Sequence, residues 1–222
     1  RIVVELMGGE QPAAQLIRQA RAGGKHVVTA NKEVMAKHGP ELIALANERR
    51  VSLLFEASVG GGIPIVGPLM KDLLANQIRS IHAIINGTTN YILTRMARDG
   101  TAFDETLREA QALGYAEADP SSDVEGRDAA FKLAILATLA FHTRVPAEAV
   151  YHEGISRLAA KDFRYAQELG YAIKLLAIAR REDDTVQARV HPVFVPQAHL
   201  LAKVDGAFNA IEVEGDLVGR VV

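Results

Sequence analysis

The sequence predicts an α/β protein in two parts, a parallel sheet with crossover helices over residues 1–64 and an α+β domain over residues 65–222. Two observations predict this division. Short strand patterns alternate with helix patterns through the first sixty residues, which is typical of a parallel sheet. After Pro64 the alternation stops, and several helices come before a region richer in strands.

The first part is expected to hold three strands and two helices. Short apolar runs predict strands at 2–6, 25–29 and 51–56, and apolar residues at helical spacing predict helices at 12–22 and 33–50. Two consecutive glycines end the first helix, as glycine commonly does. In open parallel sheets, ligands bind beyond the carboxyl ends of the strands, where loops of this sequence carry Asn, Lys and Gly residues.

The second part is expected to begin with a helix at 65–75 and a strand at 78–85. Mostly helical structure follows, with helices expected at 91–99, 104–113, 124–141, 146–151 and 161–169. Near the end, strands are expected at 186–195 and 209–213, with an irregular segment at 199–204. The helix at 124–141 is apolar on most sides, so we expect it to lie in the core.

Composition limits the possible classes of function. Hydrophobic residues make up 49% of the 222 and charged residues 23%, which is ordinary for a soluble globular protein. The net charge of −2 gives no reason to expect binding to nucleic acid or to an anionic membrane. The absence of cysteine excludes disulfides, thiolate metal sites and a cysteine nucleophile, and agrees with a cytoplasmic location. Because the chain lacks an initiator Met and ends in a strand-like run, we expect a fragment of a longer protein.

The most informative stretch of the chain, 114–132, concentrates charged residues just before a strongly apolar run at 133–137. Asp128 and Lys132 stand four residues apart and therefore share one helix face. Such a pair usually only stabilises its helix, but a lysine at the edge of a core is costly unless it is paired or chemically active. A nearby carboxylate such as Glu117 could anchor a substrate amine, and the lysine could exchange a proton with a hydroxyl.

Three further segments each allow a structural and a functional interpretation. Lys32 is either an exposed lysine near a helix start or a cation at the edge of the sheet that faces a ligand. The run 60–62 is either a tight turn or a loop whose carbonyl oxygens, near Glu56, bind a cation. In the segment 87–90, Thr88 or Thr89 either caps a helix beginning at Tyr91 or helps to hold a substrate carboxylate.

Together, and in this order, several phrases of the chain resemble homoserine dehydrogenase over nearly its whole length. The phrases lie at 4–9, 27–32, 55–64, 86–91, 114–120 with 123–126, and 174–177. The resemblance implies the C-terminal part of a Rossmann-like sheet followed by a domain for catalysis and dimerisation. It implies interconversion of L-homoserine and L-aspartate 4-semialdehyde with NADP or NAD, in the synthesis of threonine, methionine and isoleucine. A homodimer without nucleic-acid or membrane partners is implied as well.

The same resemblance assigns roles to residues. The catalytic residues it implies are Lys32, Lys132 and Asp128. The substrate-binding residues it implies are Glu117, which would bind the amino group, with Gly87, Thr88 and Tyr115. The cofactor-binding residues it implies are Thr29, Ala30, Asn31 and Lys32. Main-chain oxygens of Glu56, Val59, Gly61 and Ile63 would bind sodium.

The chain departs from the family pattern at both ends. The family's Gly-x-Gly-x-x-Gly fingerprint and the residues that select NAD or NADP are absent, as is a glycine-rich segment that the family places beyond residue 222. We therefore expect the substrate side of the site and only part of the cofactor side. Two alternatives stay open: another amino-acid dehydrogenase of the same architecture, and a non-catalytic module that keeps the fold.

Overall fold

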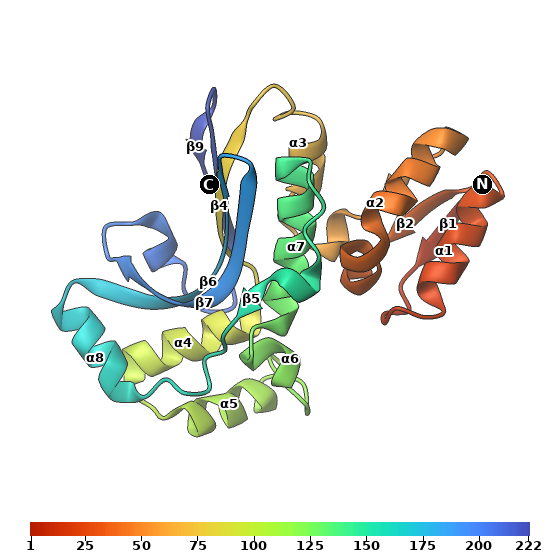
Figure 1. Ribbon diagram of the computed structural model, residues 1–222. Helices are drawn as coiled ribbons and strands as arrows, with labels where there is room; N and C mark the ends of the chain where they lie inside the picture. The colour runs from red at the N-terminus through yellow and green to blue at the C-terminus, as the bar shows by residue number, and fades with distance from the viewer.

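The computed structural model describes residues 1–222 and contains two separate sheets. A small parallel sheet lies at one end of the molecule and a larger, mostly antiparallel sheet at the other, with helix α7 (Arg127–Phe141) between them (Figure 1). The arrangement confirms the predicted α/β fold class, whereas the domain boundary at 64–65 stays a prediction. None of the helices combines the length and the apolar character that crossing a bilayer requires.

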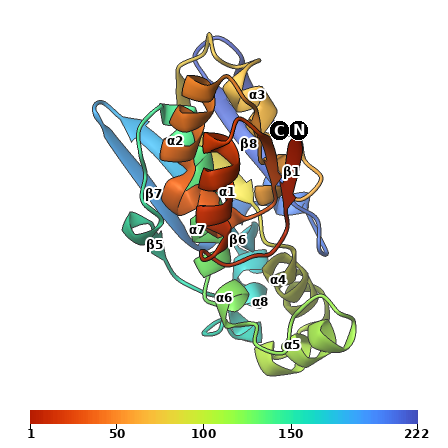
Figure 2. The ribbon, with the colours of Figure 1, turned by 90° about the vertical axis from the view of Figure 1, so that its right-hand side faces the viewer.

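The small sheet is built as the alternating pattern predicts. Strands β1 (Ile2–Glu5), β2 (His26–Thr29) and β3 (Leu53–Leu54) are parallel neighbours in that order. Helices α1 (Ala13–Ala22) and α2 (Lys32–Arg49) connect them and pack together on one face of the sheet (Figures 1 and 2). Since all three strands run in the same direction, the ends of β1 and β2 open on one edge, where α2 begins.

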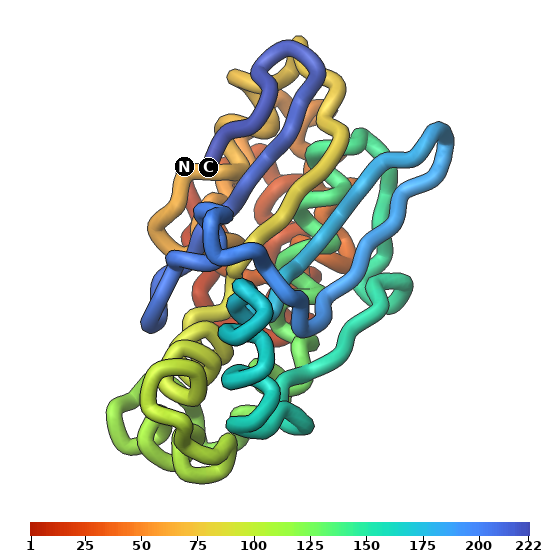
Figure 3. Tube along the Cα trace, turned by 90° about the vertical axis from the view of Figure 1, so that its left-hand side faces the viewer, coloured from red at the N-terminus to blue at the C-terminus, as the bar shows by residue number.

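The large sheet has six strands in the order β5-β7-β6-β4-β8-β9. All neighbours are antiparallel except β5 and β7. Its strands are β4 (Ile78–Ile84), β5 (Tyr151–His152), β6 (Tyr171–Glu182), β7 (Thr185–Pro196), β8 (Ala210–Gly215) and β9 (Gly219–Val221). Helix α7 packs against β4, β6 and β7 on one face, and the tube in Figure 3 shows the other face.

Of the other helices, α3 lies beside this sheet on the same side as α7, and α4, α5, α6 and α8 lie below it in Figure 1. Their bounds are α3 (Val66–Met70), α4 (Gly87–Asp99), α5 (Phe103–Ala112), α6 (Ser121–Val124), α7 (Arg127–Phe141) and α8 (Ala160–Glu168). Short 3₁₀ turns are η1 (Glu56–Ser58), η2 (Ala147–Ala149) and η3 (Leu200–Lys203). The five apolar residues at 133–137 are all buried, so α7 is the core helix that the sequence predicts.

Strand β6 is the main element that the sequence analysis missed. It runs for twelve residues between β7 and β4, in a stretch where no strand was predicted. Residues 173–179 are buried on both faces of the strand, so hydrophobicity does not alternate along it. A continuous apolar run of this length cannot be distinguished from a buried helix by its period.

Several predicted boundaries were wrong near the small sheet and the first helices. The strand expected at 51–56 pairs only at Leu53 and Leu54, because the chain turns into η1 at Glu56. The helix expected at 65–75 ends at Met70, where Lys71 leaves helical backbone angles. Helix α4 begins at Gly87 rather than Tyr91, because Asn86, and neither threonine, accepts the hydrogen bond that caps it.

Two further helices were wrong in the middle of the chain. The long helix expected at 124–141 is divided into α6 and α7 by Gly126, whose φ of +79° lies outside helical geometry. The helix expected at 146–151 is only the turn η2, after which Tyr151 enters β5.

Gly154 provides a test of the packing beside α7. A Cβ atom added there would overlap the carbonyl oxygen of Val124 and lie 2.5 Å from Cα of Glu125. We expect Gly154→Ala to lower the free energy of unfolding by about 2 kcal/mol or more, because backbone must shift to admit the methyl group. At the control position Gly62, a Cβ would meet nothing within 4 Å. Equal urea midpoints for Gly154→Ala and Gly62→Ala would contradict this packing.

Candidate active site

A buried carboxylate lies where the two parts of the chain meet. Asp128 stands in the first turn of α7, with 6% of its side chain exposed. Its Oδ1 lies 3.0 Å from Nζ of Lys32, which is the first residue of α2. Its Oδ2 lies 2.7 Å from Nζ of Lys132 and accepts a 2.9 Å hydrogen bond from Nδ2 of Asn86. One carboxylate therefore joins a lysine from the small sheet to a lysine and an amide from the larger domain.

Lys32 reaches this point because the end of the small sheet is held by a polar network. The buried carboxylate of Glu5 accepts hydrogen bonds from Oγ1 of Thr29 at 2.6 Å and from Nδ2 of Asn31 at 3.5 Å. Asn31 in turn caps α2 by accepting a 3.0 Å bond from N of Val34. Because Lys32 follows the cap directly, its backbone position is set by Asn31 and Glu5.

Asn86 organises the opposite side of the site. Its Oδ1 accepts a 2.9 Å bond from N of Thr89 and so begins α4. Its Nδ2 donates to Oδ1 of Asp123 at 2.7 Å as well as to Asp128. Lys132 is fixed from this strand end too, since its Nζ donates to the carbonyl oxygen of Ile85 at 2.9 Å.

The two acids that share Asn86 differ in their proton affinity. Burial alone would raise the pKa of Asp128, but the charge and hydrogen bond of Lys132, aided by Asn86 and Lys32, outweigh it and hold the pKa below its ordinary value. Burial raises the pKa of Asp123, and the nearby negative charge of Asp128 adds to that rise. Asp128 is therefore the more readily ionised acid of the pair.

The predicted substrate-binding residues are brought together only in part. Gly87 and Thr88 form the first turn of α4, and Oγ1 of Thr88 donates to the carbonyl oxygen of Tyr115 at 2.6 Å. The ring of Tyr115 packs on Tyr91, with ring centroids 4.7 Å apart. Glu117 is exposed, and its carboxylate makes no hydrogen bond or ion pair with Asp128 or Lys132. Its expected role stays a prediction.

The predicted cofactor segment lies at the edge of the small sheet. Thr29 and Asn31 are buried, and their side chains are engaged with Glu5 rather than directed to solvent. Gly8 and Gly9 follow β1 at the same edge with φ of +74° and +68°. The segment from Thr29 to Lys32 thus shapes the edge, and only Ala30 and Lys32 are less than fully buried.

The predicted sodium loop contains a carboxylate that is fully used by the protein. Glu56 accepts backbone hydrogen bonds from Ile65, Val66 and Gly67 at 2.6, 2.7 and 2.9 Å, which begins α3. No cluster of three or more His, Cys, Asp or Glu side chains could hold a metal ion. The binding of sodium by main-chain oxygens of Glu56, Val59, Gly61 and Ile63 stays a prediction.

Sequence analysis did not assign roles to three residues that organise the site: Asn86, Asp123 and Glu5. Asn86 stands at the end of an alternating strand and before the start of a helix, a position that favours a capping side chain. A buried Glu5 within an apolar strand was a second available signal. No local pattern could show that Asn86 also binds Asp123 and Asp128, which lie 37 and 42 residues further along the chain.

Comparison with known proteins bears directly on this site. The sequence model of the family described as homoserine dehydrogenase matches residues 64–222, and its NAD-binding domain matches residues 1–56. The chain belongs to the homoserine dehydrogenase family. It is 55% identical to a homoserine dehydrogenase of Synechocystis over 100% of the chain and 52% of that protein. It is 50% identical to one of Neisseria gonorrhoeae, covering 100% of the chain and 51% of that protein.

Solved structures of the homoserine dehydrogenase family agree with this fold. A homoserine dehydrogenase from Thiobacillus denitrificans has a TM-score of 0.96 and 55% identity, covering 99% of the chain and 51% of that protein. A hyperthermophilic archaeal homoserine dehydrogenase in complex with NADPH has a TM-score of 0.85 and 31% identity, covering 99% of the chain and 63% of that protein. The chain spans about half the length of the curated relatives it matches.

Asp123 yields a prediction about stability and pH. Because its pKa is raised in the folded state, its ionisation destabilises the fold as pH rises from its ordinary value of 3.8 through the raised value. We therefore expect Asp123→Asn to be more stable than the unmodified protein to urea at pH 7, with an advantage that shrinks as pH falls toward 4. Asp184→Asn, in an exposed turn, is the control. A pH-independent difference for Asp123→Asn would contradict the assignment.

Proposed function

We propose that the protein interconverts L-homoserine and L-aspartate 4-semialdehyde with NADP or NAD, in the synthesis of threonine, methionine and isoleucine. The supporting observation is the buried Asp128 carboxylate, which holds Lys32 and Lys132 together at the edge of the parallel sheet. The site lies within residues matched by both family models. A mobile surface ion pair would not need a buried anion with three donors around it.

A nicotinamide bound at this edge would supply the hydride acceptor, and the edge residues fit such a group. The segment from Thr29 to Lys32 and the glycines after β1 bring main chain, rather than bulky side chains, to the carboxyl ends of two strands. Backbone can therefore approach a flat ring closely there. The remaining chemistry falls to Lys32 and to the side chains of the larger domain.

Lys132 is the proposed proton acceptor for the reacting hydroxyl: as the neutral amine it takes the hydroxyl proton, directly or through water, when homoserine is oxidised. The ammonium group so formed donates to Asp128 and to the carbonyl oxygen of Ile85, and its third hydrogen is the proton that the reverse reaction returns to the substrate oxygen. Lys32, with 43% of its side chain exposed, brings a second positive charge to the same carboxylate and to developing negative charge on that oxygen.

The first turn of α4 is the proposed site for the substrate carboxylate. The amides of Gly87 and Thr88 lie at the N-terminus of a thirteen-residue helix, where free backbone N–H groups favour an anion. Tyr115 borders the same turn through its carbonyl contact with Thr88. Glu117, on the following loop, is the proposed partner of the amino group.

The direct test is homoserine-dependent reduction of NAD and NADP by the intact parent chain, followed by ultraviolet absorbance. Lys132→Met should lower kcat by at least about 100-fold, because a positioned proton acceptor contributes roughly 10²–10⁴-fold. Lys161→Met, at an exposed position on α8, is the matched control and should keep full activity.

Full turnover by Lys132→Met would show that Lys132 is not the proton acceptor. No reduction of either cofactor by a folded unmodified parent would contradict the proposed substrate. Activity on a different amino acid would then favour the alternative of a related dehydrogenase, and inactivity on all of them would favour a non-catalytic module.

We also propose that the loop from Glu56 to Ile63 binds sodium, with a contribution from Asn209. Oδ1 of Asn209 is a buried oxygen without a hydrogen-bond partner, and Nδ2 of the same side chain would lie 3.7 Å from a Cβ at Gly61. An unpartnered amide oxygen beside a loop of carbonyl oxygens fits a hard cation.

This proposal predicts a sodium-dependent melting temperature. A ligand bound only by the folded state stabilises it by about 2.7 kcal/mol at a hundredfold excess over Kd. The melting temperature of the parent should therefore rise when sodium chloride replaces choline chloride at equal ionic strength. Asn209→Leu, which has a similar shape, should lose most of that rise. An equal rise in melting temperature for both proteins would show that Asn209 does not bind the sodium ion.

We further propose that the protein is a homodimer in the cytoplasm. The face of the large sheet opposite α7 is the proposed dimer surface; it carries a small apolar cluster that includes Leu201, and Leu200 beside it in η3 is 60% exposed. The absence of cysteine agrees with a reducing compartment.

A further inference from the structure

We infer that Lys174 is a positioning residue, which holds residues 204–209 as a wall between the proposed substrate turn of α4 and the glycine loop at 60–62. The inference rests on the proposed function for its effect on the substrate, but the physical attachment can be tested without turnover. We call residues 204–209 the wall segment. It follows η3 and leads into β8.

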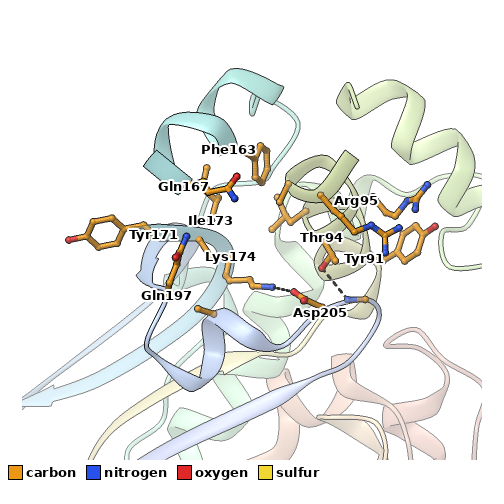
Figure 4. A pocket seen from close by; sticks show the side chains of 16 residues that line it. Tyr91, Thr94, Arg95, Phe163, Gln167, Tyr171, Ile173, Lys174, Gln197 and Asp205 are labelled. Carbon is orange, nitrogen blue, oxygen red and sulfur yellow. Dashed lines mark hydrogen bonds and ion pairs between the residues drawn. The ribbon is translucent and has the colours of Figure 1, made fainter. Parts of the chain in front are cut away.

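Lys174 is one of the few charged residues buried in this protein, with 3% of its surface exposed. Its Nζ donates to the carbonyl oxygen of Val204 at 2.6 Å, to Oδ1 of Asp205 at 3.1 Å and to Oδ1 of Asn90 at 3.4 Å. These three acceptors use all three ammonium hydrogens, and two of them belong to the wall segment. Figure 4 shows the ammonium group of Lys174 pointing to Asp205.

Helix α4 holds the same segment through two further side chains. Nδ2 of Asn90 donates to the carbonyl oxygens of Val204 at 3.0 Å and Phe208 at 3.1 Å. Oγ1 of Thr94 accepts a 3.1 Å bond from N of Gly206, which is also drawn in Figure 4. Asn90 and Thr94 are four residues apart and face the wall segment together. Lys174 approaches it from β6.

The wall segment reaches both predicted binding elements. A Cβ atom at Gly87 would lie 2.8 Å from the carbonyl oxygen of Ala207, so the absence of a side chain lets the segment contact the first turn of α4. At its other end, Asn209 lies beside Gly61. Between them Phe208 is 76% exposed, although its carbonyl oxygen is held by Asn90. The position of this segment therefore sets the width of the site beside Gly87.

A contribution to the stability of the fold is a weak explanation for a buried lysine at position 174. Burial lowers the pKa of Lys174, and the hydrogen bond that Lys174 donates to Asp205 opposes that change only in part. Asp205 is an exposed partner, with 68% of its side chain accessible, so solvent screens its attraction. A cavity of about 430 Å³ lined by Lys174, Ile173, Phe163 and Asp205 leaves room beside the segment. Without the ammonium group, the segment loses its attachment to β6, and the bonds from α4 alone oppose its movement toward that space.

The first arm of the test measures hydrogen exchange by mass spectrometry on the intact parent chain. Lys174→Met should speed exchange of wall-segment amides at least tenfold and leave the amides of α7 unchanged. Thr94→Val, a milder change of the same shape, should speed exchange at Gly206 in the same direction. Lys161→Met, at an exposed position on α8, is the control and should change exchange by less than threefold. Unchanged exchange in both Lys174→Met and Thr94→Val would overturn the inference.

The second arm measures kinetics on the same proteins. Lys174→Met should raise KM for homoserine at least fivefold, with kcat and the KM for NADP within twofold of the unmodified parent. A loss of kcat without a change in KM, or equal changes for both substrates, would contradict the role as a wall of the substrate site. If the unmodified parent fails to oxidise homoserine, the proposed function fails, and hydrogen exchange alone decides whether Lys174 holds the segment.

Discussion

The rest of the site depends on the contacts that the buried carboxylate of Asp128 makes. Taking a carboxylate out of water is costly, and here Lys32, Lys132 and Asn86 together compensate its charge. These partners come from the start of α2, from α7 and from the end of β4. The two parts of the chain are thus joined at the site that we propose for cofactor and substrate, so the same carboxylate fixes their relative position and the proposed catalytic lysines.

Polar side chains that cap the first turns of helices fix the segments around that carboxylate. Asn31 begins α2, Asn86 begins α4, and Glu56 begins α3, each by accepting backbone N–H groups at the end of a preceding strand or turn. Each cap serves the site as well, since it fixes where a lysine, an amide donor or a glycine loop lies. Lys174 likewise fixes the wall segment by a hydrogen bond to a backbone group, the carbonyl oxygen of Val204. The site is therefore preorganised by polar groups buried in the protein rather than by its surface charges.

Local sequence patterns predicted the elements of the site better than their connections. The four-residue spacing of Asp128 and Lys132 is a local signal, and the structure confirms that they pair. The pairing of Lys32 with Asp128 links residues 96 positions apart, and no periodicity contains it. Strand β6 was missed because burial on both faces removes alternation. The family resemblance supplied roles for Glu117 and the sodium loop, but these roles stay predictions.

A double-mutant cycle in the intact parent tests most directly whether Asp128 and Lys132 act as one unit. The measurement is kcat/KM for homoserine in the unmodified protein, Asp128→Asn, Lys132→Met and the double variant. Residues that act together lose activity non-additively. The kcat/KM of the double variant should therefore be no more than about threefold below that of the less active single variant. If the two losses multiply instead, the carboxylate and the lysine act independently, and the central role of Asp128 is wrong.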